Sequence, residues 1–79
     1  MKVTVRLFGP LAEQAGRAEL EVSVSEGTVR SVVAAAAVAA PELVVGPSVR
    51  FAVGTDYAGP EAAVREGDVV SLIPPVGGG

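Results

Sequence analysis

The sequence has 79 residues, which is enough for one domain with a modest core and leaves little room for a deep active-site cleft. Apolar residues make up 49% of the chain and aromatic residues only 4%, so we expect a folded core built from Val, Ala and Leu. There is no Cys and no His, the net charge is −3 and the six basic residues are scattered, which disfavours disulfides, a zinc site and nucleic-acid binding.

The first third of the chain predicts a hairpin with a short helix in its connection. Apolar and polar residues alternate over residues 2–8, which is typical of a half-buried strand, and Gly9-Pro10 ends it. Residues 11–16 then predict one or two helical turns that end at Gly16. Alternation returns over residues 18–24 and predicts a second strand, antiparallel to the first.

The middle of the chain predicts one amphipathic helix. Thr28 is suited to cap it, and Pro41 ends it. The opposite face of the helix is poor in charge, and we interpret it as a solvated alanine-rich surface rather than a docking surface. The inward positions are Val29, Val32, Val33, Ala36 and Ala40, and the outward positions are Arg30, Ala34, Ala35 and Val38.

The last third predicts three more strands. Residues 49–53 form an alternating strand, a tight turn follows, and residues 57–58 form a short strand. We expect a turn of helix over residues 61–64. The final strand, residues 69–73, is apolar on both faces, which is typical of a central strand.

These elements predict a two-layer α+β domain with a mixed sheet of about five strands packed on one main helix. If the first and last strands lie side by side at the centre, they run parallel, and the fold is a β-grasp. We expect residues 1–73 to form this domain and residues 74–79 to form a flexible C-terminal tail. The longest apolar stretch is too short to span a bilayer and no signal peptide is recognisable, which predicts a cytoplasmic protein without a membrane partner.

The domain lacks the side chains of an acid–base or nucleophilic enzyme. It has a single lysine, Lys2, and its Ser and Thr residues have no recognisable base beside them. Glu66 and Asp68 flank Gly67 and are interpreted as solvated turn residues rather than a catalytic carboxylate pair. The sequence therefore predicts a protein that is not an enzyme on its own, with no bound cofactor or metal.

The tail is the one place where chemistry is expected. Pro74 and Pro75 favour an extended chain, and the six residues after Ile73 can reach about 20 Å. Val76 offers one apolar anchor. Three glycines make the end thin enough to enter another protein's active site, although they are also typical of an unstructured terminus. The diproline directly after a predicted strand favours a functional tail with a reactive carboxylate at Gly79.

The segment "GDVVSLIPPVGGG", residues 67–79, resembles the small sulfur-carrier subunit of molybdopterin synthase, a member of the ubiquitin-like β-grasp superfamily. The matching pattern is a Gly-Asp turn, an apolar strand, Pro-Pro-Val, one variable residue and a terminal Gly-Gly. Weaker matches are "VRLFGPLAEQAG" and "GTVRSVV". The resemblance covers the whole chain.

This resemblance implies a mechanism and partners. An adenylating enzyme of the ubiquitin-activating type would use ATP to activate the carboxylate of Gly79, and a persulfide donor would supply sulfur to form a thiocarboxylate. The large subunit of the synthase, in a heterotetramer, would accept the tail and pass the sulfur to a cyclic pyranopterin precursor. The residues expected to form the partner-binding tail are Leu72, Ile73, Pro74, Pro75, Val76, Gly77 and Gly78.

Three alternatives stay open. The chain could carry sulfur for thiamine thiazole, cysteine synthesis or tRNA thiolation, although "PPV" before the glycines favours molybdopterin. It could be a ubiquitin-like modifier attached to lysines of other proteins. It could also be an interaction module with an idle tail.

Overall fold

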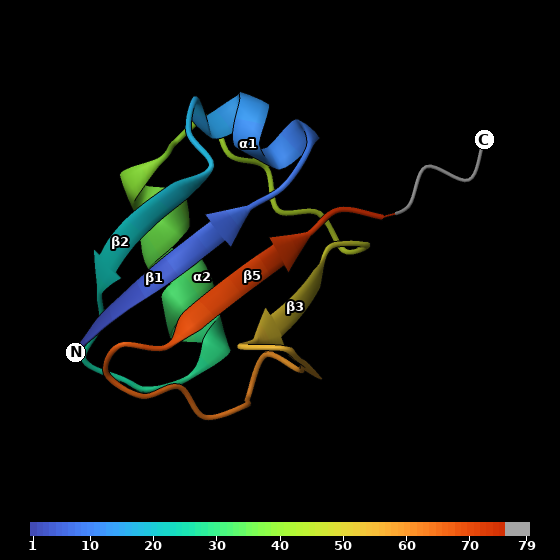
Figure 1. Ribbon diagram of the computed structural model, residues 1–79. Coiled ribbons are helices and arrows are strands. Elements are labelled where there is room, and N and C mark those ends of the chain that lie inside the picture. The colour runs from blue at the N-terminus through green and yellow to red at the C-terminus, as the bar shows by residue number, and fades with distance from the viewer. Residues whose placement is uncertain (76–79) are drawn as a thin grey trace.

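The computed structural model describes residues 1–75 and contains five strands and two helices within that range. Residues 76–79, with the predicted Val76, Gly77, Gly78 and Gly79 of the tail, lie outside the described residues. Figure 1 shows one mixed sheet with the longer helix packed across one face. The elements are β1 (Lys2–Leu7), α1 (Pro10–Ala15), β2 (Glu19–Ser23), α2 (Val29–Ala39), β3 (Arg50–Val53), β4 (Asp56–Ala58) and β5 (Val69–Ile73).

The sheet has the order β2-β1-β5-β3-β4, so the last strand of the chain is the middle strand. β1 runs parallel to β5, with Leu7 opposite Leu72, and antiparallel to β2. β3 runs antiparallel to both β5 and β4. The β1–β2 and β3–β4 hairpins therefore lie on either side of β5, which runs parallel to β1, and the predicted β-grasp fold is confirmed (Figure 1).

The core lies between α2 and one face of the sheet. The period-two residues of β1 and β5 enter it, and so do the helix positions with helical spacing. Val38, on the outer face of α2, is 81% exposed, as predicted, whereas Ala35 is half-buried and packs against the core. The largest side chains that are fully buried are Leu72, Val3, Val5, Val29, Val32 and Val70.

The first backbone N–H groups of α2 all donate hydrogen bonds, and two of them donate to a loop that is distant in the sequence. Thr28 is the N-cap and its Oγ1 accepts from the backbone N–H of Ser31 at 3.2 Å, as predicted. The backbone N–H groups of Val29 and Arg30 instead donate to the carbonyl oxygens of Ala62 and Pro60, at 3.0 and 2.8 Å. The loop over residues 60–62 thus completes the first turn of the helix.

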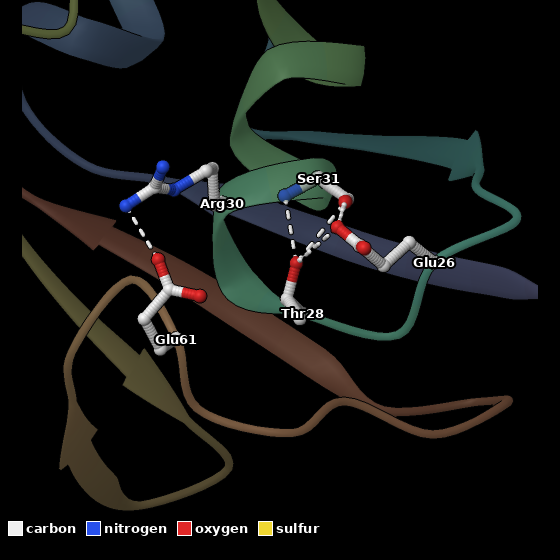
Figure 2. Close-up of polar contacts among 5 residues, drawn as sticks. All are labelled: Glu26, Thr28, Arg30, Ser31 and Glu61. Atoms are coloured by element: carbon white, nitrogen blue, oxygen red, sulfur yellow. Dashed lines mark hydrogen bonds and ion pairs between the residues drawn. The ribbon is translucent and has the colours of Figure 1, made fainter.

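This arrangement corrects one prediction. Residues 61–64 do not form a turn of helix: Glu61 lies in a turn closed by the Ala62 N–H on the Gly59 carbonyl at 3.1 Å, and Ala63 forms an isolated bridge with Thr28. Their backbone instead forms hydrogen bonds with the start of α2 and with the residues just before it. The N–H of Val64, for example, donates to the carbonyl of Gly27 at 2.9 Å. Figure 2 shows that Arg30 and Glu61 form an ion pair between the same two segments.

A carboxylate adds to the helix cap. The Ser31 hydroxyl donates to Oε1 of Glu26 at 2.9 Å, which brings a negative charge to the amino end of α2 (Figure 2). Because the N-terminal end of a helix carries a partial positive charge, this placement stabilises it.

The short helix and the strand boundaries otherwise follow the predicted pattern. α1 ends at Gly16, which adopts the left-handed conformation with φ 74°, and β2 buries Leu20 and Val22. β3 begins at Arg50, one residue later than expected, and β4 begins at Asp56, one residue earlier. Among residues 1–75, no helix has the length and apolar character needed to cross a membrane.

Candidate functional site: the root of the C-terminal tail

The tail leaves the domain from the carboxyl end of the central strand. β5 ends at Ile73, which is paired with Arg50 of β3. On the other side of β5 the pairing with β1 ends one residue earlier, at Leu72. Strands on both sides therefore hold β5 up to Leu72, and β3 holds it up to Ile73. The chain leaves the sheet at this edge, at the far end from the N-terminus (Figure 1).

The two residues before the prolines have different environments. The side chain of Leu72 is completely buried in the core, so within this domain it has no surface to offer a partner. Ile73 points to the other face of the sheet and is half-buried. Of these two predicted tail residues, Ile73 is the one whose side chain a partner can reach.

The two prolines end the hydrogen-bonded ladder. Neither Pro74 nor Pro75 has a backbone N–H, so neither can continue the pairing of β5 with its neighbours. Pro74 is half-buried and Pro75 is exposed. An ideal Cβ on Gly9 would lie 3.8 Å from Cγ of Pro74, so the first proline ring lies near the residue that precedes α1.

A shallow apolar groove of about 360 Å³ borders the prolines, and we call it the tail-root groove. One wall comes from α1 and the other from the loop between α2 and β3. The Oε1 atom of Gln14 accepts a hydrogen bond from the backbone N–H of Val44 at 2.8 Å and so joins the two walls. The lining residues are Pro10, Leu11, Gln14, Val44, Gly46, Pro47, Ser48, Val49, Pro74 and Pro75.

Sequence reasoning did not identify this groove. Gly9 and Pro10 were interpreted only as the end of a strand, and Gln14 only as part of a short helix. The contact between Gln14 and Val44 joins residues 30 positions apart, and no local sequence pattern predicts it. The one signal in the sequence is the recurrence of Pro at four positions that the fold brings together, Pro10, Pro47, Pro74 and Pro75.

The sheet face opposite α2 carries positive charge beside the tail root. Arg6 and Arg50 lie on the strands on either side of β5, opposite Ser71 and Ile73 respectively. Arg6 is paired with Glu19, with 3.0 Å between Nη2 and Oε2. Arg50 has no carboxylate within salt-bridge distance among residues 1–75. Arg50 therefore places one positive charge beside the start of the tail.

The two carboxylates of the last turn have structural partners. Oδ2 of Asp68 accepts from the backbone N–H of Arg65 at 2.9 Å, and Oε1 of Glu66 accepts from the backbone N–H of Lys2 at 2.9 Å. Their interpretation as turn residues is confirmed. Within residues 1–75, no group of three or more Asp, Glu, Cys or His residues is arranged to hold a metal ion.

Comparison with known proteins gives a family and several structural relatives. The model of the ThiS family matches residues 5–79. SAMP1, the small archaeal modifier protein 1, from Haloferax volcanii is 27% identical with a TM-score of 0.90, and all of both chains is covered. The comparison with curated proteins found no match.

Two further structures extend the range of relatives. A putative molybdopterin converting factor subunit 1 from Pyrococcus furiosus is 29% identical with a TM-score of 0.81, covering 95% of this chain and 98% of the other. A chain of the BexX/CysO complex from Amycolatopsis orientalis is 25% identical with a TM-score of 0.72, covering 98% and 99%.

Proposed function

The chain belongs to the ThiS family, and from this premise we propose that it is the small, sulfur-carrying subunit of molybdopterin synthase. The observation that carries the proposal is the position of the tail. Residues 74–79 follow directly on the middle strand of the sheet, which β1 pairs up to Leu72 and β3 pairs up to Ile73. A thin chain end is thereby attached to the most firmly supported element of the domain.

In the proposed reaction the carboxylate of Gly79 attacks the α-phosphate of ATP, and pyrophosphate leaves. A persulfide sulfur then attacks the acyl-adenylate and displaces AMP. Cleavage of the resulting acyl disulfide by a thiol leaves a thiocarboxylate on Gly79. An adenylating enzyme supplies the catalytic groups of these steps, so ATP is used by the partner and not bound by this chain.

The acceptor in this proposal is the large subunit of the synthase, which takes the tail and transfers its sulfur to a cyclic pyranopterin precursor. The similarity to the molybdopterin converting factor subunit from Pyrococcus furiosus supports this pathway, as does Pro-Pro-Val before the terminal glycines. Assembly into a heterotetramer and a cytoplasmic location stay predictions.

A second candidate function is protein modification, in which the activated carboxylate of Gly79 is transferred to a lysine of another protein. The likeness to the small archaeal modifier protein 1 favours it. Both functions begin with the same acyl-adenylate and differ in the nucleophile that displaces AMP from it. The likeness to a chain of the BexX/CysO complex in the same way supports a partner other than the large subunit of the synthase.

The test is an intact-mass measurement after incubation with the adenylating enzyme, ATP and a persulfide donor. Replacement of one oxygen by sulfur, located to Gly79 by fragmentation, is the expected result. A variant lacking Gly78 and Gly79 is the matched control and should stay unmodified. An unchanged wild-type mass, with full function of the truncated variant in cells, would contradict the proposal and support an idle tail.

A second stage of the test chooses the acceptor. The thiocarboxylated protein is mixed with the large subunit and the pterin precursor, and sulfur-containing product is measured. Loss of the terminal sulfur with formation of a dithiolene supports the molybdopterin pathway. An isopeptide bond between Gly79 and a lysine of another protein would instead support the modifier.

A further inference from the structure

Backbone N–H groups do not hold the chain at the first two residues of the tail. Beyond Ile73 the two prolines have no N–H to pair with β1 or β3. The Pro74 ring lies near Gly9, since an ideal Cβ on Gly9 would stand 3.8 Å from Cγ of the proline, and it borders the tail-root groove. The position of Gly9 and α1 therefore shapes the space into which the chain leaves the sheet.

Gly9 makes the close approach of α1 feasible. Its backbone has φ 52° and ψ −128°, a conformation that glycine adopts readily and that a residue with a Cβ adopts only under strain. Its carbonyl accepts from the N–H of Glu13 at 3.2 Å, so the same residue begins α1. The sharp change of direction at Gly9 brings the helix to the edge of the sheet where the tail leaves.

Gln14 ties this helix to the opposite wall of the tail-root groove. Its side chain accepts from the backbone N–H of Val44 at 2.8 Å, although Gln14 and Val44 are both exposed. Apart from this bond the loop before β3 has few backbone hydrogen bonds to hold it, the nearest being from Val49 to Gly46. The bond between Gln14 and Val44 therefore joins the two walls beside Pro74 and Pro75, in addition to the core packing of Leu11 on α1 and of Val45 and Val49 in the loop.

We propose that Gly9 and Gln14 are positioning residues for the tail: they hold α1 and the loop over residues 44–49 as two walls that direct the chain leaving β5 toward a partner. This inference rests on the proposed function, in which the tail enters the active site of the adenylating enzyme. A tail held in one direction is binding-competent in a larger fraction of molecules, and the apparent affinity of the partner rises by that fraction.

The test compares Gln14→Leu, which keeps the size of the side chain but has no acceptor, with Gln14→Glu, whose carboxylate can still accept from Val44. With the adenylating enzyme, ATP and a persulfide donor, Gln14→Leu should raise the KM for this protein about three- to tenfold and leave kcat within about twofold. Gln14→Glu should restore the wild-type KM. Gly9→Ala should raise the KM in the same way as Gln14→Leu.

A second readout does not depend on sulfur transfer. In a weakly aligned sample, the dipolar couplings of the Cα–Hα bonds of Pro74 and Pro75 report how well these residues keep one orientation relative to β5. They should shrink toward zero in Gln14→Leu and keep their wild-type values in Gln14→Glu, while the unfolding temperature of each variant confirms that the domain is folded.

Unchanged couplings and an unchanged KM in Gln14→Leu would overturn the proposal, and so would a Gln14→Glu variant as impaired as Gln14→Leu. If Gly9→Ala does not fold, the comparison of Gln14→Leu with Gln14→Glu still tests the proposal. If the wild-type protein acquires no sulfur at all, the proposed function fails, whereas the dipolar couplings still decide whether Gln14 positions the tail.

Discussion

The carbonyl oxygen of Val64 lies so close to Gly27 that an ideal Cβ on Gly27 would be only 2.6 Å from it. The N–H of Val64 donates to the Gly27 carbonyl at 2.9 Å, so the two backbones are in direct contact. We therefore expect Gly27→Ala to lower the free energy of unfolding by about 1–3 kcal/mol, because one backbone must move and weaken this bond. Urea denaturation measures the change.

Gly59→Ala is the matched control for this prediction. An ideal Cβ on Gly59 meets no atom within 4 Å, and Gly59 has no positive φ. The substitution should change the free energy of unfolding by less than about 1 kcal/mol, in the stabilising direction if the unfolded chain loses entropy. Equal effects of the two substitutions would show that the contact with Val64 does not matter.

The cap of α2 gives a second prediction. Thr28→Ala removes the acceptor for the N–H of Ser31 and should lower the free energy of unfolding by about 1 kcal/mol. Thr28→Ser keeps the oxygen and should restore most of the stability. Chemical denaturation followed by circular dichroism compares the three proteins. A Ser variant as unstable as the Ala variant would point to the lost methyl group instead of the lost cap.

Two adjacent residues at the end of β5 should separate stability from partner binding. Leu72 is fully buried, so Leu72→Ala should lower the free energy of unfolding by about 2–5 kcal/mol. Ile73 is half-buried on the other face, and Ile73→Ala should have a smaller effect on stability and weaken binding to the tail-accepting partner. Thermal unfolding and titration calorimetry measure the two effects. A stable Leu72→Ala protein that fails to bind would reverse these assignments.

The ion pair between Arg30 and Glu61 should contribute little to stability. Their side chains are 68% and 71% exposed, so water and salt screen the attraction. In a double-mutant cycle of Arg30→Ala and Glu61→Ala, we expect a coupling energy below about 1 kcal/mol that decreases further in high salt. A larger coupling that persists in salt would mean that the pair organises the loop over residues 60–62.

Much of the fold could be predicted because the local patterns agree with the final packing. The last strand was predicted with its observed bounds, Val69–Ile73, since a Gly-Asp turn and two prolines enclose an unbroken apolar run. The inward positions of α2 also follow directly from helical spacing, as Val29, Val32 and Ala36 show.

The predictions that failed or were missing depend on contacts between distant residues. Residues 61–64 contain two alanines and have no local reason to avoid a helix, yet the carbonyls of Pro60 and Ala62 bond to the start of α2. The bond from Val44 to Gln14 likewise depends on which segments the fold brings together. Propensity describes a segment by itself, whereas these contacts are properties of the assembled domain.

The parallel pairing of β1 with β5 has a practical consequence for handling the protein. Lys2 is the only lysine, and it lies at the start of β1, while Thr4 of the same strand pairs with Val69 at the start of β5. The Met1 α-amine lies at the same end, bonded to the carbonyl of Val24. Amine-reactive dyes, biotin reagents or coupling to a sensor chip will therefore attach the molecule by the end opposite Ile73, and an immobilised sample presents the root of its tail to the solution (Figure 1).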